Sequence, residues 1–336
     1  MSVKVAINGY GRIGRCIHRR ILQKGAPFEL CAINDITDAK TLAHLLKHDS
    51  VHGNLGNDVK SGDKTLVVDG KEIPILAERD PAKLPWKDMG VGLVLECTGL
   101  FRERDKARMH IDAGARKVLI SAPAKKEDIT IVFGVNHASY DPSKHHIISN
   151  ASCTTNCLAP MVKVLMDTVG IESAQMTTIH SYTNDQRILD LPHKDLRRSR
   201  AAALSMIPTS TGAAKAIALV FPEMEGKIDG FAIRVPTPNV SICELTLQAG
   251  KNTDAETLNA AFRKAAEGEL KGVLAYTEDP VVSIDFNGTS VSCTLDSGLT
   301  KVMNGNNVKA CGWYDNEYGY ASRMVDVAGL ICEKGF

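Results

Sequence analysis

Cys153 stands where the sequence changes from small polar residues to a helical pattern, a position that suits thiol chemistry. Apolar residues recur at three- and four-residue steps beyond it until Gly170 closes the pattern. Ser149, Asn150 and Ser152 are good helix caps, so we expect Cys153 in the first helical turn. Unpaired backbone N–H groups at a helix start favour a thiolate over a thiol. The alternative is a buried structural cysteine, the commoner role for any one of the nine cysteines.

His180 is the candidate base for this thiol. It follows a predicted strand over residues 174–179, which would hold the imidazole rigidly at the end of the strand. An imidazole beside Cys153 would stabilise the thiolate and later transfer a proton. One histidine among ten is more often structural or exposed to solvent. A nucleotide-binding pattern in the same chain nevertheless favours the catalytic role.

That pattern is the spacing GxGxxG at Gly9, Gly11 and Gly14, between a predicted strand and a predicted helix. Such glycines let the backbone approach a pyrophosphate, and the helix start supplies N–H groups and a positive dipole. Asp35 follows the next strand, 21 residues after Gly14, where a carboxylate can hold an adenosine ribose. The alternative is an ordinary tight turn, but the strand, turn, helix and acid together favour a dinucleotide site.

Strands and helices alternate in the first half of the sequence. Strands are predicted over residues 3–8, 28–33, 93–96, 117–121, 130–134 and 146–149, and helices over residues 12–24, 38–48 and 103–115. Residues 54–75 are rich in β-forming residues and suggest inserted hairpins. This alternation predicts an α/β fold with a Rossmann-type doubly wound, mostly parallel sheet.

In such a sheet, binding residues gather at the carboxyl ends of the strands. Thr98 and Gly99 follow one predicted strand and Ser121 ends another, so these residues are candidates for cofactor contact. They would serve equally well as simple turn residues. Arg79 could pair with a phosphate or face solvent.

The pattern changes after residue 151. Strands are predicted over residues 174–179, 231–234, 241–247, 281–286, 290–295 and 309–314, and helices beginning at Cys153 and over residues 212–220 and 254–270. Grouped helices and consecutive strands predict an α+β catalytic domain with an antiparallel sheet. We therefore expect a dinucleotide-binding domain over residues 1–151 and a catalytic domain over residues 152–315. A closing helix over residues 316–336 is expected to pack back on the first domain.

A cofactor domain and an activated thiol together indicate aldehyde oxidation through a thioester. Attack of the thiolate on an aldehyde gives a hemithioacetal, whose C–H bond is a good hydride donor to NAD. A second nucleophile must then release the acyl group. Phosphate sites use hydroxyls, backbone N–H groups and arginine forks. The second domain offers such groups at Ser152, Thr154, Thr183, Arg198, Thr211, Gly212 and Arg234. Singly, each has an ordinary role as a helix cap or a solvated side chain.

The composition excludes several classes of protein. The 336 residues are 44% hydrophobic and 24% charged, with a net charge of +1, which favours a soluble globular protein and no nucleic acid as primary partner. No apolar run is long enough to span a membrane, and the first residues leave no room for a signal peptide. Nine scattered cysteines favour a reducing cytoplasm. The spacing of Cys153 and Cys157 fits no metal-binding motif, and we predict no metal site.

Six segments carry a resemblance to a known family: residues 8–14 (NGYGRIG), 149–157 (SNASCTTNC), 180–183 (HSYT), 211–215 (TGAAK), 234–240 (RVPTPNV) and 313–319 (WYDNEYG). Across essentially its whole length, the chain resembles phosphorylating glyceraldehyde-3-phosphate dehydrogenases. The resemblance implies oxidation of D-glyceraldehyde 3-phosphate to 1,3-bisphosphoglycerate with NAD and inorganic phosphate, a reaction of glycolysis and gluconeogenesis. It also implies a homotetramer in which the loop over residues 181–205 packs across a subunit interface.

The resemblance also implies roles for individual residues. Cys153 would be the nucleophile and His180 its base partner. NAD would be held by Arg12, Ile13, Asp35, Arg79, Ser121 and Asn316, the last of which would orient the nicotinamide amide. The substrate phosphate would be bound by Thr183 and Arg234. The attacking phosphate would be bound by Ser152, Thr154, Thr211 and Gly212, with assistance from Arg198.

Two residues bear on the choice of NAD over NADP. Asp35 would accept hydrogen bonds from a ribose 2′-hydroxyl and repel a 2′-phosphate. Leu191 and the proline after it resemble the apolar pair of the family members that use NAD. The sequence therefore predicts NAD.

Three alternatives remain. An erythrose-4-phosphate dehydrogenase would share the fold and the thiol but release its thioester with water, whereas the intact Thr211-Gly212 segment favours phosphorolysis. A protein that primarily binds RNA or host proteins has no support from the near-neutral charge and few aromatic residues. A structural protein with inert cysteines would show no selective alkylation of Cys153.

Cys157 lies one helical turn beyond Cys153, and we expect it to pack rather than react.

Overall fold

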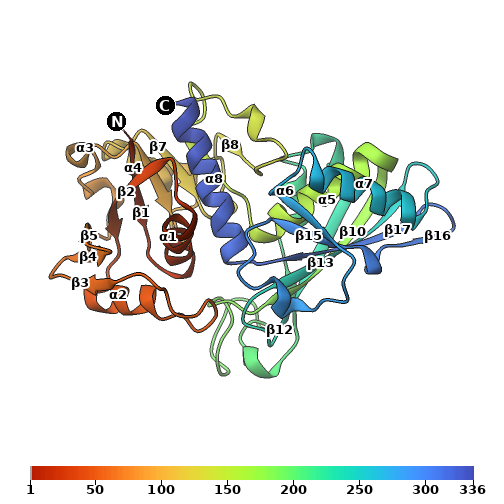
Figure 1. Cartoon of the computed structure of the whole chain (residues 1–336), viewed down its shortest axis with the longest axis horizontal. Coiled ribbons are helices and arrows are strands. Elements are labelled where there is room, and N and C mark those ends of the chain that lie inside the picture. The colour runs from red at the N-terminus through yellow and green to blue at the C-terminus, as the bar shows by residue number, and fades with distance from the viewer. Residues whose placement is uncertain (1) are drawn as a thin grey trace. The chain divides into compact units, whose positions relative to one another are not determined.

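The computed structural model describes residues 2–336, which form two compact units (Figure 1). The first unit comprises the chain up to Ile131 together with His137–Ala151 and Ala321–Phe336. The second unit comprises Val132–Asn136 and Ser152–Tyr320.

The first unit is built on a sheet with β1 near its centre. The strand order is β3 (Val59–Ser61), β4 (Thr65–Val68), β5 (Lys71–Leu76), β2 (Phe28–Asn34), β1 (Val3–Asn8), β6 (Leu93–Glu96), β7 (Lys117–Ile120), β9 (Ile147–Ser149) and β8 (Ile129–Thr130). Strands from β5 to β8 pair in parallel, and β3, β4 and β5 pair as antiparallel hairpins. The chain leaves β1 towards β2 and later returns on the other side at β6, so the carboxyl ends of β1 and β6 form a topological switch point. The predicted doubly wound α/β sheet is confirmed.

Helices of this unit connect its strands, and most of the C-terminal helix also belongs to it. They are α1 (Arg12–Lys24), α2 (Ala39–Lys47), α3 (Trp86–Met89), α4 (Arg104–Asp112) and most of α8 (Tyr318–Lys334). The later part of α8 lies against α1, where Asp326 is 3.9 Å from the Arg20 guanidinium. The C-terminal helix thus begins two residues later than the sequence predicts.

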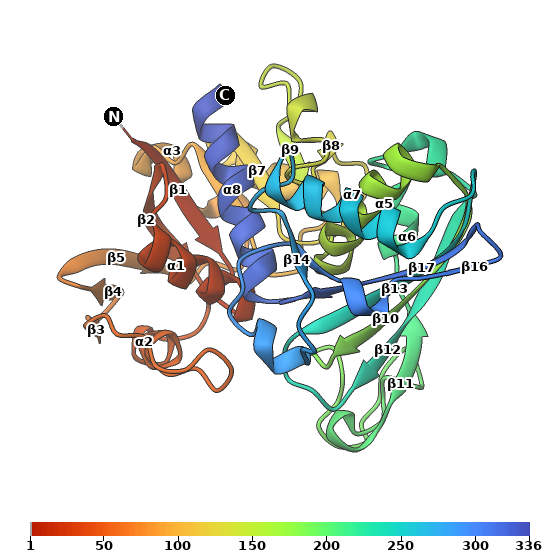
Figure 2. The ribbon, with the colours of Figure 1, turned by 45° about the vertical axis from the view of Figure 1, so that its right-hand side comes forward.

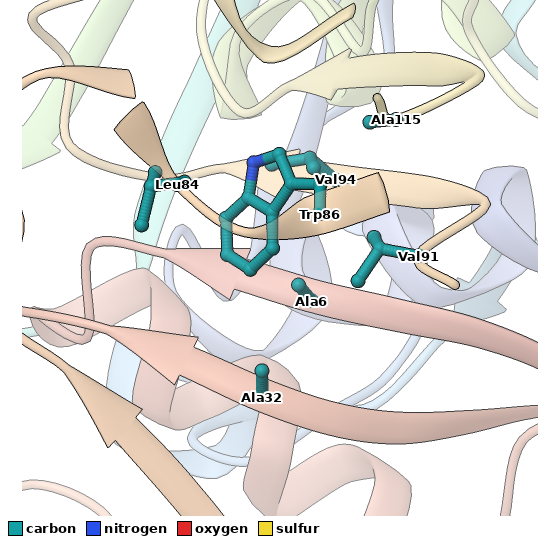
Figure 3. Packing of buried hydrophobic residues seen from close by; sticks show 7 residues of the cluster. All are labelled: Ala6, Ala32, Leu84, Trp86, Val91, Val94 and Ala115. Carbon is teal, nitrogen blue, oxygen red and sulfur yellow. The ribbon is translucent and has the colours of Figure 1, made fainter. Parts of the chain in front are cut away.

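Small side chains on adjacent strands admit one large ring into the core (Figure 3). Ala6 of β1, Ala32 of β2 and Val94 of β6 surround the fully buried indole of Trp86. The nearby Val91 is also buried, so the ring is enclosed by aliphatic groups. Ala6 is the direct partner of both Ala32 and Val94 in the parallel pairing, so the three side chains meet the ring at one level of the sheet.

The second unit contains a mainly antiparallel sheet. The strand order is β11 (Ile207–Ser210), β12 (Ile228–Val235), β10 (Ile171–Ser181), β13 (Ser241–Ala249), β17 (Asn307–Tyr314), β15 (Cys293–Asp296) and β14 (Leu274–Thr277), with β16 (Lys301–Met303) on β17. The pairs β10–β12 and β14–β15 are parallel. Figure 2 shows α5 (Cys153–Val169), α6 (Ala213–Ile217) and α7 (Ala255–Glu267) grouped on one side of this sheet. The predicted α+β architecture is confirmed.

Two predicted strands are wrong. The strand expected over residues 130–134 ends at Thr130, because the following backbone turns and Val132 N–H donates to the Asn136 side chain at 2.8 Å. The segment over residues 281–286 forms a 3-10 turn, Ser283–Phe286, because the Asp285 carboxylate accepts a hydrogen bond from Val282 N–H. The strands β11, β14 and β16 are too short and irregular in pattern to have been predicted.

No helix within residues 2–336 combines the length and apolar character needed to cross a membrane.

His18 should make the stability of the first unit depend on pH. It is buried in α1, where its Nδ1 atom meets the Tyr10 hydroxyl, and burial lowers its pKa to about 3. In the unfolded chain His18 would have a pKa of about 6.5. Below that pH the unfolded chain binds a proton that the folded chain does not, so the stability is lost as the pH falls. Between about pH 7.5 and about pH 5 the free energy of unfolding should fall by about 2 kcal/mol on this account. Urea unfolding should show a smaller fall for His18→Gln, and equal falls would contradict the assignment.

Candidate active site

The glycine turn of the first unit leaves no space for a side chain at Gly9 or Gly14. Gly9 has φ +92°, and a Cβ there would lie 2.7 Å from the backbone nitrogen of Thr98. A Cβ on Gly14 would collide with the carbonyl oxygen of Gly9. Gly11 has open space around it and caps α1 without a side-chain hydrogen bond. The turn therefore forms a tight cradle with unoccupied room at the helix start, as a pyrophosphate requires.

The Asp35 carboxylate lies at the end of β2 and is tied to this turn. Its two oxygens accept hydrogen bonds from Tyr10 N–H at 2.7 Å and Thr37 N–H at 2.9 Å. A carboxylate has further lone pairs, and the half-buried Asp35 can offer them to ribose hydroxyls. Arg79 lies beyond the end of the neighbouring strand β5 and is exposed.

The other cofactor candidates lie along neighbouring strand ends. Thr98 follows β6, and its N–H donates to the Glu96 carboxylate at 2.8 Å. Ser121 follows β7, and its N–H donates to the Glu96 carbonyl at 2.9 Å. Gly99 has φ +73°. These residues thus lie at the carboxyl ends of β6 and β7, the two strands that come after β1 in the sheet. A dinucleotide site at the switch point requires residues at these ends.

The first turn of α1 also carries two predicted residues. Ile13 is half-buried there. The Arg12 guanidinium is 2.6 Å from the Asp49 carboxylate. The position of Arg12 in the structure is therefore set by an ion pair within the first unit.

Cys153 is the first residue of α5, as predicted, and its sulfur faces His180. Ser152 caps the helix by accepting a hydrogen bond from Thr155 N–H at 3.0 Å. The Cys153 Sγ atom is 3.5 Å from His180 Nε2. His180 Nδ1 is 2.7 Å from the Ser181 carbonyl oxygen, an acceptor, and 2.9 Å from an Arg234 guanidinium nitrogen, a donor. In the tautomer that donates to Ser181 the proton is on Nδ1, and the unprotonated Nε2 faces the thiol, as a general base must.

The protonation states of this pair are set by burial. Burial raises the pKa of the Cys153 thiol, opposed by the positive charge of Arg234 and by hydrogen bonds involving Thr154. Desolvation therefore opposes the thiolate that the helix start favours. Burial and the charge of Arg234 lower the pKa of His180 to about 3. A neutral imidazole at His180 can take the proton of Cys153 when the sulfur attacks.

Arg234 is positioned beside His180 by the parallel pairing of β10 with β12, in which the two residues are direct partners. One guanidinium nitrogen donates to the Ser181 carbonyl at 2.9 Å. Its Nε atom is buried without a hydrogen-bond partner among the described residues. The positive charge of Arg198 also acts here, because it lowers the pKa of both His180 and Arg234. A half-buried guanidinium with an unused donor, near a second guanidinium, suits an anion.

The other phosphate candidates have structural partners. Arg198 contacts Asp185, donates to the Thr209 hydroxyl at 2.7 Å and donates to a backbone carbonyl of β11. Thr183 N–H donates to the Gln186 side chain at 2.8 Å. The Thr211 hydroxyl accepts from a backbone N–H at the start of α6, which Gly212 caps.

Tyr314 was not predicted as a site residue, and it lies among the residues around Cys153 and His180. Its hydroxyl is 2.8 Å from the hydroxyls of both Thr154 and Thr178. Its ring meets the His180 ring edge-on, with centroids 5.9 Å apart. The available signal was its place in the segment over residues 313–319, where only Asn316 was assigned. Thr154 is thereby buried against Tyr314.

Known proteins match this chain over both units. Residues 3–104 match the family model described as glyceraldehyde 3-phosphate dehydrogenase, NAD binding domain, and residues 152–316 match that of its C-terminal domain. The chain is 61% identical to glyceraldehyde-3-phosphate dehydrogenase of Geobacillus stearothermophilus, with 100% of each chain covered. It is 58% identical to glyceraldehyde-3-phosphate dehydrogenase 1 of Bacillus cereus, with 99% of each covered. The chain therefore belongs to the glyceraldehyde-3-phosphate dehydrogenase family.

Proposed function

We propose that the protein oxidises D-glyceraldehyde 3-phosphate to 1,3-bisphosphoglycerate, using NAD and inorganic phosphate, in glycolysis and gluconeogenesis. The observation that carries the proposal is the cluster of Cys153, His180 and Arg234, which combines a nucleophile, a base and an anion-binding group. Family membership supports the same reaction.

The cluster supplies each proton transfer that the reaction needs. Cys153 Sγ attacks the aldehyde carbon, and its proton passes through His180 Nε2 to the aldehyde oxygen, which gives a hemithioacetal. NAD, when bound, accepts the hydride from that carbon. His180 takes the hydroxyl proton as the thioester forms. A phosphate oxygen then attacks the thioester carbon, and sulfur leaves and recovers a proton from His180.

Two anions must bind near this thiol. We assign the substrate phosphate to Thr183 and Arg234, which is supported by the unused buried donor of Arg234. We assign the attacking phosphate to a set of hydroxyl and backbone donors, Ser152, Thr154, Thr211 and Gly212, assisted by Arg198. In the structure the three hydroxyls make internal hydrogen bonds, so binding would add to or replace these contacts.

A Cβ at either end of the glycine cradle would collide with backbone, so only glycines permit this tight turn. The close backbone approach that they allow fits the pyrophosphate of NAD. We assign NAD to the residues of the first unit that line the strand ends and helix start, together with one residue of the second: Gly9, Gly11, Arg12, Ile13, Gly14, Asp35, Arg79, Thr98, Gly99, Ser121 and Asn316. We equate residues 1–151 with the NAD-binding domain and residues 152–315 with the catalytic domain, and place the helix over residues 316–336 with the former.

Asp35 should set the preference for NAD over NADP. Asp35→Gly removes the negative charge that repels a 2′-phosphate and the acceptor for the 2′-hydroxyl. The ratio of kcat/KM for NAD to that for NADP should fall by about tenfold to a hundredfold, the effect expected for a charged hydrogen bond. Steady-state kinetics with both cofactors measure it. Asp63→Gly, at an exposed turn between β3 and β4, is the control. An unchanged ratio in Asp35→Gly would refute this role.

The dependence on phosphate tests the proposed reaction against erythrose-4-phosphate oxidation. NADH formation is followed with each aldehyde, with and without inorganic phosphate. Sustained turnover should require glyceraldehyde 3-phosphate and phosphate together. Turnover that is independent of phosphate, or faster with erythrose 4-phosphate, would favour the alternative.

We also propose a cytoplasmic homotetramer in which the loop over residues 181–205 packs at a subunit interface. Large apolar side chains on this loop face solvent in the single chain: Ile188, Leu189 and Leu196 are 86%, 73% and 80% exposed. A cluster of this kind favours a protein interface. The nine cysteines, all within residues 2–336, are free thiols, which fits a reducing compartment. Sedimentation equilibrium would test the assembly.

A further inference from the structure

Ser181, at the end of β10, is a junction of hydrogen bonds in the second unit. Its carbonyl accepts from His180 Nδ1 and from Arg234. Its N–H donates to the Ser241 hydroxyl at 3.1 Å, and its own hydroxyl donates to the Val240 carbonyl at 2.6 Å. All of these groups belong to one largely buried cluster.

The Ser241 hydroxyl links this junction to Asn316. Its oxygen accepts from the Ser181 backbone N–H, and its own proton is donated to the Asn316 side chain. The partner 2.8 Å away is Asn316 Oδ1, in a side chain that is 5% exposed. Because Ser241 donates to the amide oxygen, the NH₂ group of Asn316 points away from Ser241 and remains available as a donor.

We propose that Ser241 is a positioning residue that fixes the amide orientation of Asn316 for the carboxamide oxygen of the nicotinamide. This inference rests on the proposed function and on the role assigned there to Asn316. Without the Ser241 hydroxyl, the amide could rotate and present its oxygen instead, which would repel the carboxamide oxygen.

The backbone before Ser241 supports a positional role. Val240 has φ +67°, a left-handed conformation that a β-branched residue rarely adopts, and its side chain is buried. Such a conformation is held only where the surroundings determine it, and it is typical of functional sites. Here it turns the Val240 carbonyl towards Ser181 and places the Ser241 hydroxyl between Ser181 and Asn316.

Binding of two ligands separates this role from a general structural one. NAD carries the nicotinamide, whereas ADP-ribose lacks it and shares the rest of the contacts. In titration calorimetry, Ser241→Ala should weaken NAD binding about tenfold, as expected for the loss of one well-placed hydrogen bond. Its affinity for ADP-ribose should stay within about twofold of wild type. Ser241→Thr, which keeps the hydroxyl, should restore NAD binding.

A double-mutant cycle tests the link to Asn316. If Ser241 acts through that amide, Ser241→Ala should have no further effect on NAD affinity in an Asn316→Ala background. An equal loss in both backgrounds, equal weakening of NAD and ADP-ribose, or unchanged NAD affinity in Ser241→Ala would overturn the proposal. If Ser241→Ala does not fold, Ser241→Cys keeps the size with a weak donor and replaces it in each arm.

The proposed function and the positioning role of Ser241 can be refuted separately. Wild-type protein is first assayed for NAD reduction with glyceraldehyde 3-phosphate and phosphate. Absence of that reaction refutes the proposed function. A wild type that reacts normally, with a Ser241→Ala variant of equal NAD affinity, refutes the positioning role alone.

Discussion

Replacing Cys153 with serine is expected to lower kcat by at least about a thousandfold, because the acyl group would have no thiol to carry it. The serine hydroxyl is a far weaker acid than the thiol, and the neighbouring imidazole, with its lowered pKa, is a weak base. NAD affinity should remain close to wild type. Stopped-flow and steady-state measurements of NADH formation check the rate.

Cys157→Ala is the matched control for this substitution. Cys157 lies one helical turn further along α5 and is fully buried, with its thiol directed at the Gly312 carbonyl at 3.6 Å. Its loss should change kcat by only a few fold. Limited iodoacetamide treatment, followed by mass spectrometry, should label Cys153 first, because the neighbouring His180 Nε2 can take the thiol proton as sulfur reacts. A Cys153→Ser variant with a tenth of wild-type activity, or equal labelling of the other cysteines, would contradict the assignment.

His180→Asn is expected to lower kcat by about a hundredfold to ten-thousandfold, the usual contribution of a general base. The asparagine amide can still donate to the Ser181 carbonyl, so the local fold should be retained. It cannot accept the proton that Nε2 takes from Cys153 at 3.5 Å. The substrate KM should change little, because Arg234 stays in place.

His44→Asn serves as the control, because His44 is an exposed residue of α2. Its kcat should match that of wild type. If His180→Asn kept more than about a tenth of wild-type kcat, His180 could not be the principal base.

The parts of the site that depend on local sequence could be predicted. The tight turn at Gly9 and the position of Asp35 follow from short-range patterns, because strand, turn and helix signals lie within the same 35 residues. The cap at Ser152 placed Cys153 at a helix start for the same reason. Local patterns also place β1, β2, β6, β7 and β9 to within one residue at each end.

The remaining features depend on tertiary contacts. Tyr314 reaches Thr154 and Thr178 only because β17, β10 and α5 pack together, and no local pattern encodes that meeting. The desolvation that raises the pKa of Cys153 could not be predicted, because burial is a property of the folded unit, whereas the helix start is visible in the sequence. The turn at Asp285 resembled a strand because its apolar residues alternate with polar ones.

Trapping the acyl-enzyme tests the central claim most directly. The protein is mixed with glyceraldehyde 3-phosphate and NAD in the absence of inorganic phosphate, quenched with acid and digested for mass spectrometry. We expect one NADH per active chain and a 3-phosphoglyceryl group on the peptide containing Cys153. Added phosphate should remove this group and restore turnover. An acyl group on another residue, or continuous NADH formation without phosphate and without an adduct, would contradict a thioester on Cys153.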